Sequence, residues 1–142
     1  MMRRLVKKSG QRGAAAIEFA IILPLLVLLI FGMIEFSVLF YDKAMITNAS
    51  REGARAGIVF STLGPLSDDQ IHQVVANYCS DHLVSFQLGS VVSTTVTRTG
   101  TSSGDRLTVR VEYPYDFLIL PNLVTGLTGP LNLSAETIMR ME

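Results

Sequence analysis

An apolar run near the N-terminus constrains this chain more than any other feature. Residues 14–41 contain only two charged side chains, Glu18 and Glu35, and residues 19–34 contain none. A helix needs about 20 predominantly apolar residues to cross a bilayer. Hydrophobic residues also make up 49% of the chain and charged residues only 17%, values that point to a membrane segment. The run therefore predicts a transmembrane helix over residues 14–41.

The charges on either side of the run predict its orientation. Five basic residues precede it, and Asp42 follows it; the basic residues are Arg3, Arg4, Lys7, Lys8 and Arg12. Because basic residues collect on the cytoplasmic side, we expect a cytoplasmic N-terminus and a single pass through the cytoplasmic (inner) membrane. The C-terminal part would then be periplasmic or extracellular. A cleaved secretory signal fits poorly, since its apolar region spans only about 7–15 residues and small residues follow that region.

Two residues within the run need a separate explanation. Pro24 lacks an amide proton and crowds the carbonyl of Ala20, so we expect a helix kink there. Glu18 is costly in a membrane, by about 2.5–3.5 kcal/mol at the bilayer centre and less near its boundary. Glu18 either forms an ion pair with Arg12 or Lys8 at the membrane boundary, or it binds a cationic group of another subunit within an assembly.

The junction between the basic leader and the apolar run resembles a known processing site. Gly13 ends the leader, Ala14 begins the run, Glu18 is the fifth residue after Gly13, and Phe19 is the sixth. This order resembles the site at which a dedicated membrane peptidase cuts type IV pilins and pseudopilins. The segments RGAAAIEFAIILPLL, FGMIEFSVLFY and NASREGARAG are similar to TadE-like proteins, which are minor pseudopilins of the tight-adherence (Tad, Flp) pilus system. The resemblance covers about residues 11–57.

The resemblance implies a function, a processing site and a set of partners. It implies leader cleavage between Gly13 and Ala14, and roles in assembly for Glu18 and Phe19. A new amine at Ala14 and the Glu18 carboxylate would offset each other's desolvation, within one subunit or between neighbours. The partners implied are the lipid bilayer, a prepilin peptidase, and other pilins and pseudopilins of the same system.

The chain is thus expected to be a non-enzymatic, membrane-anchored subunit that supports pilus biogenesis and surface adherence. Its place in the filament, at the tip or in the base is left open. The alternative is an uncleaved single-pass anchor that holds a binding domain outside the cytoplasm.

Residues beyond the apolar run predict a helical stem and a small α+β domain. We expect a leader at 1–13, the transmembrane helix at 14–41, a helical extension at 42–57 and an extracytoplasmic domain at 58–142. Gly57 would suit the C-cap of the long helix. A continuous helix over residues 14–57 would be about 66 Å long. About half of it would then extend beyond a bilayer core roughly 30 Å thick.

The domain is expected to contain one helix and an antiparallel sheet of about three strands. Ser67 and Gln70 have the spacing of a capping box. The apolar face that follows has helical spacing and consists of Ile71, Val74, Val75, Tyr78, His82 and Leu83. Residues 91–98, 106–113 and 131–137 are predicted as strands. Residues 99–105 are predicted as a turn, Pro114 and Pro121 as breaks in the sheet, and 121–130 as a loop.

The sequence offers little for catalysis, metal binding or nucleic-acid binding. The candidate ligands are His72, Cys79 and His82, but a fourth ligand is missing and the two histidines diverge by about 80° around a helix. Cys79 is expected to pack as a small buried hydrophobe. The formal net charge is zero, which excludes a strongly basic nucleic-acid binder. We therefore expect no enzyme activity, no cofactor and no metal.

Overall fold

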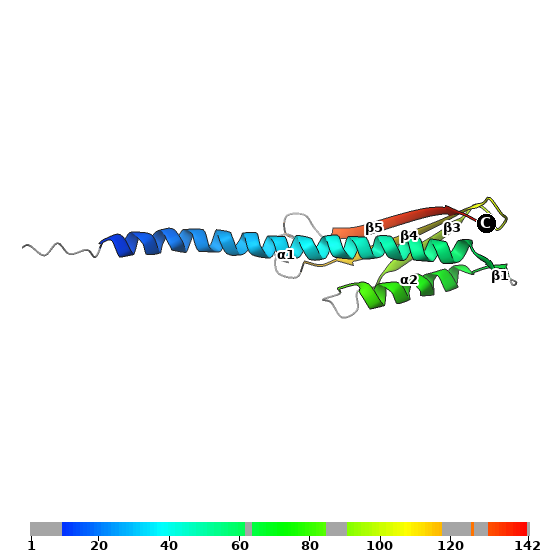
Figure 1. The fold of residues 1–142 in the computed structure, drawn as a ribbon, viewed down its shortest axis with the longest axis horizontal. Helices are drawn as coiled ribbons and strands as arrows, with labels where there is room; N and C mark the ends of the chain where they lie inside the picture. Colours follow the sequence, from blue (N-terminus) through cyan, green and yellow to red (C-terminus); the bar gives the residue numbers. More distant parts are fainter. Residues whose placement is uncertain (1–9, 62–63, 85–90, 118–125, 127–130, 142) are drawn as a thin grey trace, which may run out of the picture. The chain divides into compact units, whose positions relative to one another are not determined.

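The computed structural model describes residues 10–61, 64–84, 91–117, 126 and 131–141 (Figure 1). The elements are α1 (Gly10–Ile58), β1 (Phe60–Ser61), β2 (Gly64–Pro65), α2 (Asp68–His82), β3 (Ser93–Arg98), β4 (Arg106–Tyr115) and β5 (Leu131–Arg140). The chain divides into two compact units, Met1–Ile34 and Glu35–Glu142. A long apolar helix, a second helix and a three-stranded antiparallel sheet confirm the predicted α+β class.

The first helix is longer at its N-terminal end than predicted. It begins at Gly10 instead of Ala14, and it continues through Pro24 to Ile58. Gly57 lies inside the helix, and the only described glycines with a left-handed backbone are Gly64 and Gly104. The prediction that Gly57 caps α1 is therefore wrong. Gly57 instead lets Leu107 approach, because a Cβ at this position would lie 2.5 Å from the Leu107 Cδ2 atom.

The start of α2 confirms the predicted capping box. The Ser67 hydroxyl accepts a hydrogen bond from the Gln70 backbone N–H at 3.3 Å, and the Ser67 N–H donates to Gln70 Oε1 at 3.0 Å. Both contacts satisfy groups that have no partner within a helix end. The buried face of α2 consists of Ile71, Val75 and Cys79, each one turn from the next.

The sheet has the order β3-β4-β5 and is antiparallel throughout. Its register places Val96 opposite Val109, and Val111 opposite Ala135. The alternation that predicted a half-buried strand holds along β4, whose buried residues are Leu107, Val109, Val111, Tyr113 and Tyr115. Residues 99–105 form the turn between β3 and β4, as predicted.

Pro114 does not break the sheet, contrary to the prediction. It lies within β4 and is opposite Asn132 of β5. The pairing of β3 with β4 extends only to Ser93 and Glu112, so within the described residues no strand adjoins Pro114 on its second side. A proline, which has no N–H to donate, is tolerated in a strand at such a place. The predicted break at Pro121 and most of the predicted loop at 121–130 lie outside the described residues.

The second part of α1 forms one wall of the hydrophobic core. Ile46, Ala49 and Ala54 have no exposed surface. At Gly53, a Cβ would lie only 2.6 Å from Val75 Cγ2, so α2 approaches α1 closely here. The folded unit thus begins at Glu35, upstream of residue 58, where we predicted the extracytoplasmic domain to begin. The segment predicted as a stem, 42–57, belongs to this unit.

Candidate processing and assembly site

Gly13 and Ala14, the predicted cleavage site, lie near the start of α1. Both are exposed, and a Cβ added to Gly13 would meet no atom within 4 Å. Nothing in the described part of the chain covers this stretch of backbone. The site is thus open to another molecule, although it is helical in this state.

Glu18 and Phe19 are also exposed on α1. Glu18 forms no hydrogen bond or ion pair with any side chain that the structure describes. The side chains of Lys8 and Arg12 lie outside the described part, so an interfacial pair with either of them stays a prediction. The described residues leave Glu18 available to a partner from outside the unit.

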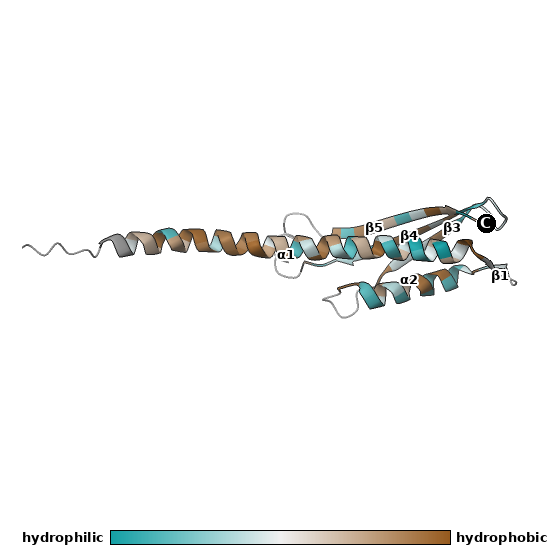
Figure 2. Ribbon diagram, in the orientation of Figure 1, coloured by the Kyte–Doolittle hydropathy of each residue, from teal (hydrophilic) through white to brown (hydrophobic). Residues whose placement is uncertain are grey.

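The surface around these residues is almost entirely apolar. Large hydrophobic side chains are exposed along α1 from Ile17 onward, and hydropathy colouring shows the same stretch in brown (Figure 2). The helix is long and apolar enough to cross a membrane, and none of its most apolar segment is buried. A core helix of a water-soluble protein would bury these side chains. A membrane location is therefore plausible.

A second group of polar residues lies on α1 within the folded unit. Glu35 is only 3% exposed, and its Oε1 atom accepts a hydrogen bond from the Tyr115 hydroxyl at 2.9 Å. Asp42 is fully buried; its Oδ1 atom accepts a hydrogen bond from the Val84 N–H at 3.1 Å. Within the described structure, Asp42 Oδ2 has no partner. Sequence reasoning missed this cluster, although the seven-residue spacing of Glu35 and Asp42 places both on one helix face.

Burial shifts the pKa values of Asp42 and Tyr115. It raises the pKa of Asp42, and the hydrogen bond from Val84 lowers it by a smaller amount. Burial, reinforced by the neighbouring Glu35 carboxylate, raises the pKa of Tyr115 far above its usual range. The Tyr115 hydroxyl is therefore a permanent donor at neutral pH.

Two further polar contacts join α1 to β5. The Lys43 ammonium donates to the Ser134 carbonyl. The hydroxyl groups of Ser50 and Thr137 are hydrogen-bonded at 2.7 Å. These contacts and the Glu35–Tyr115 pair attach the same face of α1 to the sheet.

The candidate metal ligands do not share one surface. Cys79 is 3% exposed, whereas His72 and His82 are exposed, and the His82 ring stacks on Tyr78 at 4.3 Å between centroids. Among the described residues, no three His, Cys, Asp or Glu side chains form a group that could hold a metal ion. The predicted packing role of Cys79 is confirmed.

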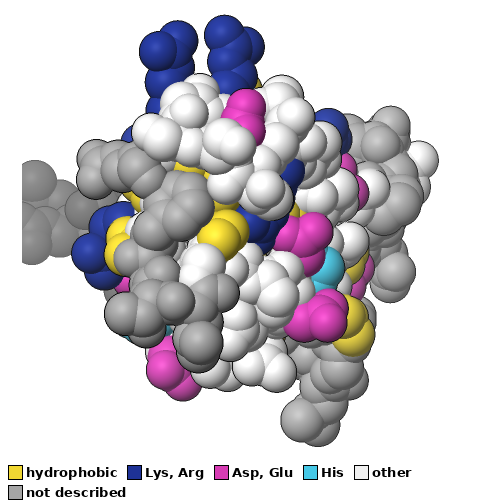
Figure 3. All heavy atoms as spheres, turned by 90° about the vertical axis from the view of Figure 1, so that its right-hand side faces the viewer, with side chains coloured by type: hydrophobic (Ala, Val, Ile, Leu, Met, Phe, Trp, Pro, Cys, Tyr) yellow, Lys and Arg dark blue, Asp and Glu magenta, His cyan; other side chains and the backbone are white. Residues whose placement is uncertain are grey.

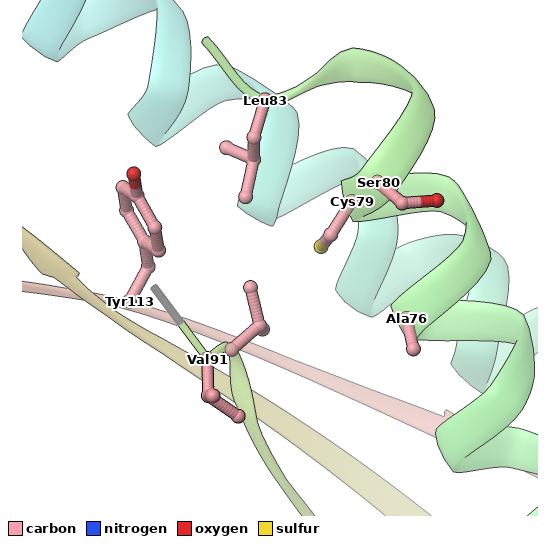
Figure 4. Close-up of a pocket in the computed structure, with 7 residues that line it drawn as sticks. Ala76, Cys79, Ser80, Leu83, Val91 and Tyr113 are labelled. Atoms are coloured by element: carbon pink, nitrogen blue, oxygen red, sulfur yellow. The ribbon is translucent and has the colours of Figure 1, made fainter. Parts of the chain in front are cut away.

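Cys79 also borders a pocket of about 320 Å³ (Figure 4). The pocket is lined by Ala76, Cys79, Ser80, Leu83, Val91, Val92 and Tyr113. Burial raises the pKa of the Cys79 thiol to about 11. The sulfur is therefore a thiol at neutral pH, and not the thiolate that nucleophilic or metal chemistry requires.

The described structure defines a class of protein with one apolar N-terminal helix, able to span a membrane, that continues into a small α+β unit. Residues 13–55 match the family model for TadE-like proteins, and this match confirms the resemblance predicted over residues 11–57. The family suggests a membrane protein associated with the Tad pilus. No curated protein and no solved structure matches the chain.

Proposed function

We propose that this protein is a structural pseudopilin of a Tad (Flp) pilus, a non-enzymatic membrane subunit that supports pilus assembly and surface adherence. The observation that carries the proposal is the TadE-like match at residues 13–55. Within that match, Gly13 and Glu18 stand at the head of an exposed apolar helix. Processing and assembly both need these residues to be accessible to other proteins.

In this proposal the chain crosses the cytoplasmic (inner) membrane once, with its N-terminus in the cytoplasm. A prepilin peptidase cuts between Gly13 and Ala14 and leaves a free amine at Ala14. The amine is cationic at neutral pH. It pairs with Glu18 of the same or a neighbouring subunit, and each charge then offsets the desolvation of the other. Phe19 and the apolar side chains that follow pack against other pilins and pseudopilins.

The residues with reactive side chains support a structural role. The Cys79 sulfur lies against the core, and its raised pKa keeps it protonated. The Tyr115 hydroxyl is engaged by Glu35. Pilus assembly requires only binding surfaces, which is why we assign no enzymatic step to this chain.

The proposal is tested by the mass of the mature protein. We expect intact-mass measurement and N-terminal sequencing of membrane-extracted protein to find a chain that begins at Ala14, in cells that carry the matching peptidase. Gly13→Leu should block cleavage, because a large side chain would obstruct the peptidase, whereas Gly13→Ala should still be cut. A wild-type chain that begins at Met1 would contradict the proposal and favour an uncleaved anchor with an extracytoplasmic binding domain.

A further inference from the structure

We propose that three aromatic residues of α1, Phe36, Phe40 and Tyr41, seat the folded unit in the outer headgroup layer of the bilayer. All three lie within the Glu35–Glu142 unit and are exposed. Tyrosine is enriched at membrane–water boundaries, because one end of its ring is apolar and the other is polar. The inference rests on the membrane anchoring that the proposed function requires, and it places the folded unit in contact with lipid instead of on a stem.

The exposed apolar surface of α1 ends at these residues. Phe36 is 59% exposed and Phe40 is 67% exposed. Beyond Tyr41, the next large hydrophobic side chain that is exposed is Val59, after the end of the helix. Along the sequence of α1, the aromatic group is therefore the last of the exposed large hydrophobic side chains.

Helix length places the same residues at the edge of the hydrocarbon core. At about 1.5 Å per residue, residues 14–34 extend roughly 31 Å, which matches a hydrocarbon core of about 30 Å. Residues 36–41 would then lie within about the next 10 Å of helix, at the level of the lipid headgroups. The first compact unit ends at Ile34, where this length is reached.

The acidic residues of this stretch are turned away from the aromatic group. Glu35 is 3% exposed and hydrogen-bonded to Tyr115, and Asp42 is fully buried. The surface formed by Phe36 and Phe40 therefore carries no exposed carboxylate from its own helix turns. An interfacial lipid layer fits such a surface, because an apolar side chain lies next to the acyl chains without an exposed carboxylate beside it to desolvate.

The opposite end of the folded unit has a different character. Residues 99–104 consist of threonine, serine and glycine, and all of them except the half-buried Gly100 are exposed. The end-on view shows few hydrophobic side chains there (Figure 3). This end is suited to contact with water, and the contrast with the Phe36–Phe40 turn supports lipid as the occupant of the aromatic surface.

The chain contains no tryptophan, so a single tryptophan can report on one position. We would reconstitute full-length Phe40→Trp into phosphatidylcholine vesicles that contain lipids brominated at shallow or deep acyl positions. We expect blue-shifted emission and the strongest quenching by the shallow bromines. The matched control is Ile138→Trp on β5, a position that is 58% exposed. Its emission should be that of an indole in water, and neither lipid should quench it.

Leu28→Trp, in the middle of the apolar run, separates this inference from the proposed function. Deep bromines should quench Leu28→Trp most strongly. If no bromine quenches it, the membrane anchor itself fails, and the inference with it. If Leu28→Trp is quenched but Phe40→Trp shows the emission and quenching of Ile138→Trp, the membrane anchor is supported. The contact of Phe36, Phe40 and Tyr41 with the headgroup layer is then overturned. Blue-shifted Phe40→Trp emission without quenching by either lipid would also overturn the proposed lipid contact, because protein would then cover this surface.

Discussion

The Tyr115 hydroxyl donates a hydrogen bond to Glu35 Oε1 at 2.9 Å and thereby joins residues that lie 80 positions apart in the sequence. Tyr115 is the last residue of β4, and Glu35 is the first residue of the folded unit on α1. Both side chains are buried. The contact therefore fixes the sheet to α1 at the place where the helix enters the folded unit.

Removal of the Tyr115 hydroxyl should destabilise the folded unit. Tyr115→Phe keeps the ring but takes a donor from a buried carboxylate, which typically costs about 1.5–3 kcal/mol. The measurement is thermal or urea unfolding of the full chain in detergent micelles. Tyr113→Phe is the matched control, because Tyr113 is also buried on β4 but has no hydrogen bond from its hydroxyl among the described residues. Equal stability of the two variants would show that the Glu35 contact contributes nothing.

Asp42 should make the folded unit less stable as the pH rises. Its pKa is raised in the folded state, so the folded state binds this proton more tightly than the unfolded chain does. Stability then falls as the pH rises from about 4 through the folded pKa, and the loss persists at neutral pH. Asp42→Asn keeps an oxygen for the Val84 N–H but carries no charge. The free energy of unfolding of Asp42→Asn relative to the wild type should therefore increase between pH 4 and pH 7. A difference that stays constant over this range would show that the pKa of Asp42 is not raised.

Gly53→Ala should destabilise the protein although alanine is the better helix former. Alanine gains about 0.8–1.0 kcal/mol of helix propensity over glycine. The added Cβ, however, would lie 2.6 Å from Val75 Cγ2, and overpacking of this kind costs about 1–3 kcal/mol. Melting temperatures of Gly53→Ala and of Gly53→Ala with Val75→Ala test the explanation. Gly53→Ala should lower the melting temperature less in the Val75→Ala background than in the wild type, because the Val75 Cγ2 atom is then absent. A higher melting temperature for Gly53→Ala than for the wild type would contradict the contact.

Cys79 should react slowly with thiol reagents in the folded protein. A pKa of about 11 leaves little thiolate at pH 8, so labelling should be roughly a hundredfold slower than in the unfolded chain. The rate should rise steadily with pH up to about 11. The check is spectrophotometric labelling with an aromatic disulfide, with and without urea. Equal rates under the two conditions would show that the core does not protect the sulfur.

Glu18→Ala should separate assembly from anchoring. The change removes a costly carboxylate from the apolar run, so insertion and cleavage should proceed as in the wild type. Assembly should fail, because loss of one member of a desolvated ion pair costs about 3–5 kcal/mol, or at least two decades in association. The assay is complementation of a deletion strain, scored by piliation and membrane fractionation. Glu52→Ala is the control, since it removes a carboxylate from an exposed pair with Arg55, and it should support piliation. Piliation by Glu18→Ala at the wild-type level would exclude an assembly contact.

Local patterns predicted the elements whose determinants are close in sequence. The Ser67–Gln70 capping box and the alternation along β4 depend on neighbours a few residues apart, so the start of α2 and the inward face of the sheet were predictable. The prediction for Pro114 was wrong because its tolerance depends on where β3 begins, at Ser93 opposite Glu112, which is a non-local property. The TadE-like match at residues 13–55 was likewise predictable, because the resemblance rests on short local patterns.

The buried acids and tight glycines required contacts between distant segments. Glu35 was read only as an interruption of the apolar run, since its partner Tyr115 lies far along the chain. The close contact at Gly53 was not predictable either, because nothing in the helix sequence reveals that Val75 of α2 lies against it. Helical spacing alone did not show which face of α1 the sheet would cover.

One helix supplies both the apolar run and a wall of the hydrophobic core, and this decides which fragment of the chain is able to fold by itself. A fragment that began at residue 58 would lack Ile46, Ala49 and Ala54, and the apolar faces of α2 and β4 would be left open to solvent and to aggregation. A fragment that begins at Glu35 retains this wall and both ends of the Glu35–Tyr115 hydrogen bond. We therefore expect that a fragment able to fold by itself must include the last turns of the apolar run and not only the residues that follow the helix.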